Sequence, residues 1–158
     1  MRAMLRARAM LRANPICSLV CAGIFLAATG LYGAEQAAQT VGWSTLKMLT
    51  SSTPQNSPVR QLQGKRVSIP GFMVPLEDDA QEVTEFLLVP YAGACIHVPP
   101  PPPNQMVYVQ LIHGGKAKMS FTEPIVVTGT LKISTVKSPY GDVSYNLDGE
   151  TVKPYVEQ

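Results

Sequence analysis

The chain has 158 residues and a formal net charge of +2, but four of its 13 basic residues lie within the first 34 positions. From Glu35 onward nine basic residues stand against 11 acidic ones, so the net charge there is −2 and a basic surface for nucleic acid is not expected. This part of the chain is long enough for one domain with its own hydrophobic core.

Residues 1–34 predict a secretory signal peptide, and hence a periplasmic protein. A basic start is followed by an apolar run at residues 16–28 and by small residues around Ala34. The apolar run is about 13 residues long, whereas a spanning helix needs roughly 20. An uncleaved anchor is the alternative, because Tyr32 is bulky for a position so close to the cut. Lipidation of Cys21 is not favoured, since the preceding "SLV" lacks the expected small residue.

Residues 35–60 predict a flexible start, one short helix and a loop. Trp43, Leu46 and Leu49 have helical spacing within "VGWSTLKML", residues 41–49. The following "TSSTPQNSP", residues 50–58, has the composition of a loop.

Residues 61–158 predict a single β domain. We expect strands at residues 65–75, 83–90, 105–112, 124–134 and 142–152, with a hairpin signal at His113-Gly114-Gly115. In the fourth strand the residues of one face recur with a period of two, at Ile125, Val127, Gly129, Leu131 and Ile133.

These short strands predict an all-β fold, an OB-like barrel of five or six strands with one short N-terminal helix. Pro70-Gly71 and Gly129 interrupt strands, and a barrel strand that bends at a corner favours such residues. A small β-sandwich is the alternative.

Cys95 is the one cysteine expected to remain after the signal is removed, because Cys17 and Cys21 leave with it. A disulfide framework is therefore excluded. An unpaired thiol in an oxidising compartment is a liability unless it is buried, bound to a metal or used in chemistry.

His97 follows Cys95 by two positions, so in an extended backbone both side chains project to one face, with Cα atoms about 6.5 to 7 Å apart. A thiolate and an imidazole suit zinc first, with copper as the alternative. A metal site needs further donors. The candidates for a third ligand are His113, Glu77, Asp78 and Asp79. A buried or hydrogen-bonded structural pair is the competing interpretation, and a reactive thiol is another.

A proline run follows the Cys-His pair and predicts a stiff polyproline II rod of about 15 Å. It is interpreted either as a plain connector or as a preformed binding ridge, with its side-chain amides bonding back to the free carbonyls of the rod. The ridge consists of Pro99, Pro100, Pro101, Pro102, Pro103, Asn104 and Gln105.

The segments "LQGKRVSIPGFMVPLE", "VTEFLLVPYAGACIHVPPPPPNQMVYV" and "PIVVTGTL", in that order, resemble the bacterial domain-of-unknown-function 3299 family. The resemblance covers roughly residues 43–147. It implies a small periplasmic protein or lipoprotein without an established activity. Some members are encoded beside ABC-transporter components and histidine-rich periplasmic proteins in metal-responsive loci, which strengthens the metal hypothesis. The family motif includes Cys95 and His97 but not His113.

We therefore expect a periplasmic accessory binding protein that handles a transition metal, zinc first, next to an ABC transporter or a periplasmic metal-binding protein. The first alternative is a metal-free interaction module that docks through the proline ridge. The second is a thiol enzyme with Cys95 as nucleophile, but no orienting group or oxyanion hole is visible, so we expect no enzymatic activity. Nucleic acid is not an expected partner, and membrane contact is expected only through an uncleaved signal or a partner.

Overall fold

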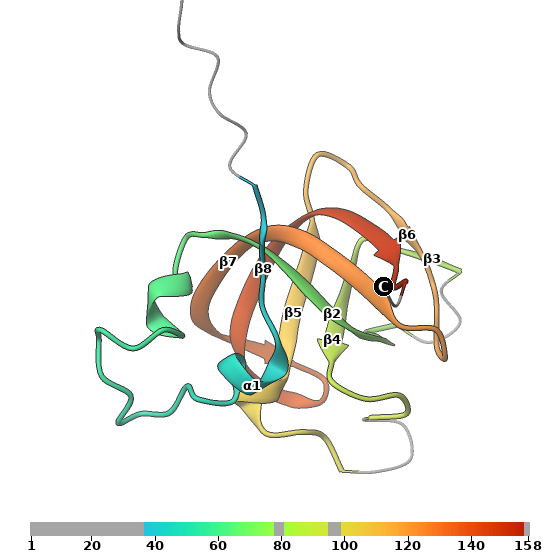
Figure 1. The fold of residues 1–158 in the computed structure, drawn as a ribbon. Helices are drawn as coiled ribbons and strands as arrows, with labels where there is room; N and C mark the ends of the chain where they lie inside the picture. Colours follow the sequence, from blue (N-terminus) through green and yellow to red (C-terminus); the bar gives the residue numbers. More distant parts are fainter. Residues whose placement is uncertain (1–36, 78–80, 95–98, 157–158) are drawn as a thin grey trace, which may run out of the picture. The chain divides into compact units, whose positions relative to one another are not determined.

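The computed structural model describes residues 37–77, 81–94 and 99–156. Most of the regular structure in these ranges is β-strand (Figure 1). None of the helices in the described ranges is long and apolar enough to cross a bilayer. The elements are β1 (Gln39–Thr40), α1 (Trp43–Leu46), η1 (Arg60–Leu62), β2 (Arg66–Pro75), β3 (Glu82–Val83), β4 (Glu85–Val89), η2 (Pro103–Gln105), β5 (Val107–Leu111), β6 (Ala117–Lys118), β7 (Ile125–Ser138) and β8 (Gly141–Pro154).

Five of the described strands close into a barrel. In the sheet order β1-β2-β4-β5-β8-β7, β2 also pairs with β7, so hydrogen bonds run around a complete ring. Strand β2 makes the closure, because Arg66–Gly71 pairs with β7 and Phe72–Pro75 pairs with β4. Strands β5 and β8 are parallel, and the other ring neighbours are antiparallel. The predicted all-β, OB-like barrel is confirmed.

The barrel bends at the two glycine positions that the sequence singled out. A Cβ atom at Gly71 would lie 2.7 Å from the backbone oxygen of Val89, so a side chain there would clash. A Cβ at Gly129 would collide with the backbone oxygen of Asp148, and the β7–β8 register shifts between Thr128 and Gly129. Both glycines therefore allow a close approach between neighbouring strands.

Alternating residues of the long strands fill the barrel interior. On β7, Ile125, Val127 and Leu131 are buried, as the period of two predicts. On β8, Tyr145 and Leu147 are fully buried and face the same core. The inward faces of β7 and β8 thus belong to one core.

The segment before β2 packs into this core. Val41, Leu46 and Val59 belong to the same hydrophobic cluster as the strands, and Leu46 is fully buried. The hydroxyl of Tyr145 donates a hydrogen bond of 2.7 Å to the Leu46 carbonyl. The expected helix at residues 41–49 is confined to Trp43–Leu46, and the loop after it places Val59 back in the core.

Several strand boundaries differ from those expected. The predicted strand at 83–90 is divided into β3 and β4, and the one at 105–112 begins only at Val107, after η2. Strand β7 continues to Ser138 and strand β8 begins at Gly141, because their pairing extends to the turn. The two strands therefore form a long hairpin.

The barrel has two distinct ends, which follow from the strand directions. Strands β2, β5 and β8 run one way, and β4 and β7 run the other way. The end at which β2, β5 and β8 finish is called the mouth end. The connections there also form the small β3–β6 sheet. The opposite end, which we call the helix end, carries α1, residues 90–94 and 99–106 from between β4 and β5, and the β7–β8 turn (Figure 1).

Candidate functional site

The predicted metal ligands fall into two groups. Cys95, His97, Asp78 and Asp79 lie outside the described residues. His113 and Glu77 are described, and both are exposed in connections at the mouth end. His113 has a φ of 57° in the turn after β5, so its backbone is left-handed.

Ala94 and Pro99, the nearest described residues before and after the Cys-His pair in the sequence, lie at the helix end. His113 and Glu77 follow strands that finish at the other end. Among the described residues, no group of three or more His, Cys, Asp or Glu side chains is arranged to hold a metal ion. The metal site therefore stays a prediction.

The proline ridge is described from Pro99 onward. Pro99, Pro100, Pro102 and Pro103 are exposed, whereas Pro101 is buried. Pro102 has φ −57° and ψ 153°, close to polyproline II values. The predicted rod nevertheless does not include all five prolines, because Pro103 starts the 3-10 helix η2.

Asn104 fixes the ridge to α1. Its side-chain nitrogen Nδ2 donates hydrogen bonds of 2.9 Å to the carbonyls of both Lys47 and Leu49. These carbonyls lie just after α1, so Asn104 bonds to the helix segment. The predicted bonding of the Asn104 amide back to the rod is therefore wrong. Its Oδ1 is buried and lacks a hydrogen-bond partner within the described part of the chain.

A second hydrophobic cluster covers the outer face of β4. Leu87 and Val89 are fully buried there although they point away from the barrel interior. They pack against Ala94 in the segment after β4, Met106 directly after η2, and Val143 in β8. In OB barrels the outer face of the second and third strands is the usual surface for oligonucleotides and oligosaccharides. In this chain, part of that face is occupied by the protein's own side chains.

Tyr108 lies beside this cluster on β5. Its hydroxyl donates a 2.8 Å hydrogen bond to the Glu85 carboxylate. Burial first, and then the hydrogen bond and the negative charge of Glu85, raise the pKa of Tyr108 to about 12. The tyrosine is therefore neutral at physiological pH and serves as a hydrogen-bond donor to the carboxylate.

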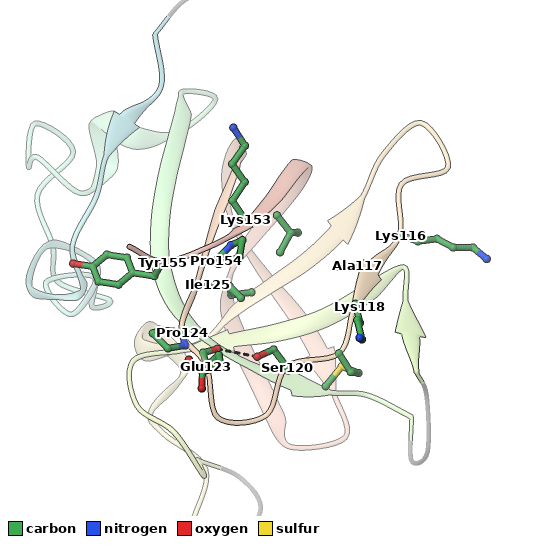
Figure 2. Close-up of a pocket in the computed structure, with 12 residues that line it drawn as sticks. Lys116, Ala117, Lys118, Ser120, Glu123, Pro124, Ile125, Lys153, Pro154 and Tyr155 are labelled. Carbon is green, nitrogen blue, oxygen red and sulfur yellow. Dashed lines mark hydrogen bonds between the residues drawn. The ribbon is translucent and has the colours of Figure 1, made fainter. Parts of the chain in front are cut away.

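An open pocket of about 460 Å³ lies at the mouth end (Figure 2). Mouths of β-barrels are common positions for small-molecule sites. The start of β7, the end of β8, β6 and the loop after β6 surround it. The lining residues are Lys116, Ala117, Lys118, Met119, Ser120, Glu123, Pro124, Ile125, Val152, Lys153, Pro154 and Tyr155.

This mouth pocket combines an apolar floor with a charged rim. Ile125 and Ala117 are buried, and they belong to the main core. Lys118 and Lys153 are exposed on the rim, and Figure 2 shows them on separate segments around Ile125. Sequence reasoning missed this pocket, because the two lysines are 35 positions apart and carry no motif.

The model of a family described as "Protein of unknown function (DUF3299)" matches residues 26–154. The crystal structure of a DUF3299 family protein from Pseudomonas aeruginosa PAO1 is similar, with 34% sequence identity and a TM-score of 0.63. That match covers 77% of this chain and 99% of the other.

A putative aspartyl-tRNA synthetase from Leishmania major Friedlin matches more weakly, with 11% identity and a TM-score of 0.43 over 84% of this chain and 23% of that one. At this level the likeness supports no functional argument. No curated protein matches the chain.

Proposed function

The chain belongs to the DUF3299 family of proteins of unknown function, and from this premise we propose that it is an exported binding protein that docks a partner protein through its proline ridge. The export signal in residues 1–34 supports a periplasmic location. In this proposal the barrel is a rigid support and has no enzymatic role.

One observation carries the proposal: the ridge is exposed and at the same time held in place. Pro99, Pro100 and Pro102 are exposed, while Pro101 between them is buried. Asn104, two residues after Pro102, is bonded to the segment that follows α1. A ridge that is already ordered loses little conformational entropy when a partner binds it.

The chemistry of the ridge indicates the kind of partner. Exposed proline rings in a polyproline II conformation are recognised by grooves lined with aromatic side chains. Met48, which is 51% exposed, lies between the two residues whose carbonyls bind Asn104, so this segment also presents an apolar side chain to solvent. We therefore propose a partner with an aromatic-lined groove, and a component of a membrane transporter is the first candidate.

A matched pair of double variants tests this proposal. Pro100→Ala with Pro102→Ala removes two exposed rings from the ridge. Pro54→Ala with Pro58→Ala removes two exposed rings from the loop before η1. Cross-linking in the periplasm and mass spectrometry identify the captured protein, and a binding titration then measures its affinity. We expect the ridge variant to lose the partner and the loop variant to keep it.

The same experiment separates docking from the competing proposal of metal handling through Cys95 and His97. Docking predicts that a Cys95→Ala variant keeps its partner and that zinc leaves the affinity unchanged. Retention of one zinc or copper ion per chain after dialysis, lost together with the partner in Cys95→Ala, would instead favour metal handling. Equal partner binding by the two double-proline variants would refute docking through the ridge.

A further inference from the structure

We infer that the mouth pocket binds a small carboxylate with an apolar body of medium length, of the kind found in a medium-chain fatty acid. The pocket lies at the opposite end of the barrel from the proline ridge. The inference therefore stands independently of the proposed docking function and adds a ligand to the molecule.

The floor of the pocket favours an apolar ligand. Ile125 and Ala117 are only 5% and 6% exposed, and Val152 and Met119 are partly buried and pack against the main core. An alkyl chain that enters the pocket would therefore contact side chains that already belong to the core. Each methylene group removed from water in this way strengthens binding by about fourfold.

The pocket stays open because the strands end at its floor and the loop before β7 turns beside the opening. Strand β7 begins at Ile125, which pairs with Pro154 at the finish of β8, so the strands end level with the floor. In the connecting loop the Ser120 hydroxyl donates a 3.1 Å hydrogen bond to the Glu123 carbonyl, which fixes a turn beside the opening (Figure 2). A volume of about 460 Å³ lies within the range of ordinary small-molecule sites.

The rim supplies positive charge for an anionic head group. Lys116 has a partner, since its Nζ lies 3.7 Å from a carboxylate oxygen of Glu82. Lys118 and Lys153 form no ion pair with any residue that the structure describes. Figure 2 shows the two side chains leaving the rim in different directions, so an anion whose apolar body lies on the floor would contact one ammonium group directly and be attracted by the other at a longer distance.

The composition of the rim favours a carboxylate over a phosphate. Phosphate sites typically use arginine forks or several backbone N–H groups, and the lining contains no arginine. Glu123 also lines the pocket, and its carboxylate would repel a dianion more strongly than a monoanion. With Lys116 paired to Glu82, Lys118, Lys153 and Glu123 leave the rim with a net charge of +1, which suits a single negative charge.

Calorimetric titration of the purified protein with decanoate tests the inference. Decanol, which lacks the charge, and butyrate, which lacks most of the body, serve as probes of the two parts. The double variant Lys118→Gln with Lys153→Gln removes the rim charge, and Lys47→Gln with Lys65→Gln removes two exposed lysines elsewhere. Amide NMR shifts locate the bound ligand.

We expect decanoate to bind with shifts at residues 117–125 and 152–155, and decanol and butyrate to bind at least tenfold more weakly. Loss of the two rim lysines should raise the decanoate Kd by about tenfold, whereas the control pair should leave it unchanged. The inference is overturned if decanol binds as tightly as decanoate, if both lysine pairs have the same effect, or if no shifts appear at the pocket.

Discussion

The two ends of the barrel differ in how the hydrophobic core is covered. At the helix end, the Tyr145 hydroxyl and the Asn104 amide bind carbonyls of the α1 segment, and Leu46 fills the interior below them. At the mouth end, the β3–β6 sheet and the loop to β7 leave a pocket above Ile125. One end is closed by packing and hydrogen bonds, and the other is left open.

This difference assigns protein docking to the closed end and binding of a small molecule to the open end. A closed end can present an ordered ridge to a protein, because the backbone below it is fixed at several points. An open end can accept a small molecule, because apolar side chains remain partly accessible there. We therefore expect substitutions at the helix end to affect folding strongly, and substitutions at the mouth to affect folding weakly.

The largest expected effect is that of Leu46→Ala. Leu46 is fully buried, so its truncation leaves a cavity and lowers the free energy of unfolding by about 3 kcal/mol. Met119→Ala at the mouth is the matched comparison, because Met119 is only partly buried. It should lower the free energy of unfolding by roughly 1 kcal/mol. Urea denaturation of both variants measures the difference.

Equal destabilisation by the two substitutions would contradict the contrast between the ends. Met119 would then act as an ordinary core residue, and the space beside it would not be available to a ligand. A smaller effect of Leu46→Ala than of Met119→Ala would reverse the assignment of the closed end.

The fold was predictable because the relevant signals are local. The alternation from Ile125 to Ile133 identifies β7 without knowledge of its neighbours. Gly71 and Gly129 mark bends because no side chain fits there. The start of η2 at Pro103 was not predictable, since proline fixes φ near the value shared by polyproline II and 3-10 helices, and only ψ separates them.

The candidate sites were less predictable because they depend on contacts between distant residues. Asn104 reaches carbonyls 55 and 57 positions earlier in the chain. Lys118 and Lys153 line one pocket because the loop after β6 leads to the start of β7, where Ile125 pairs with Pro154 of β8. Neither arrangement can be recognised from the local composition of the sequence. The Cys95–His97 motif, by contrast, is evident in the sequence, and its role stays a prediction.

The second prediction concerns the attachment of the ridge. Asn104→Ala removes both hydrogen bonds to the α1 segment and should lower the free energy of unfolding by about 1 to 2 kcal/mol. The unpaired Oδ1 is removed as well, which keeps the loss at the lower part of that range. Hydrogen exchange should become faster at the amides of Met48 and Leu49, which bond within the same segment.

Asn56→Ala is the control for this prediction, since Asn56 is exposed in the preceding loop. It should leave both the stability and the exchange rates unchanged. If Asn104→Ala behaves in the same way, the ridge is not held by this side chain and its order has another source.

The smallest expected effect is a pH dependence at the helix end. Burial raises the pKa of Tyr145 well above its usual value, with a smaller opposing contribution from the charge of Arg60. The unfolded chain ionises this tyrosine near pH 10, while the folded chain keeps it protonated, so the stability from its buried neutral hydroxyl is present below pH 10 and falls as the pH rises further. Tyr145→Phe cannot ionise and should escape this part of the alkaline loss.

At pH 7 the phenylalanine variant should be less stable by about 1 kcal/mol, because the hydrogen bond to the Leu46 carbonyl is gone. Above about pH 10 the wild-type protein loses stability faster, so the two curves of unfolding free energy against pH should converge. Tyr108 also has a raised pKa, so both curves are best measured in a Tyr108→Phe background. Parallel curves up to pH 11 would mean that solvent reaches the Tyr145 hydroxyl, and that the helix end is as open as the mouth.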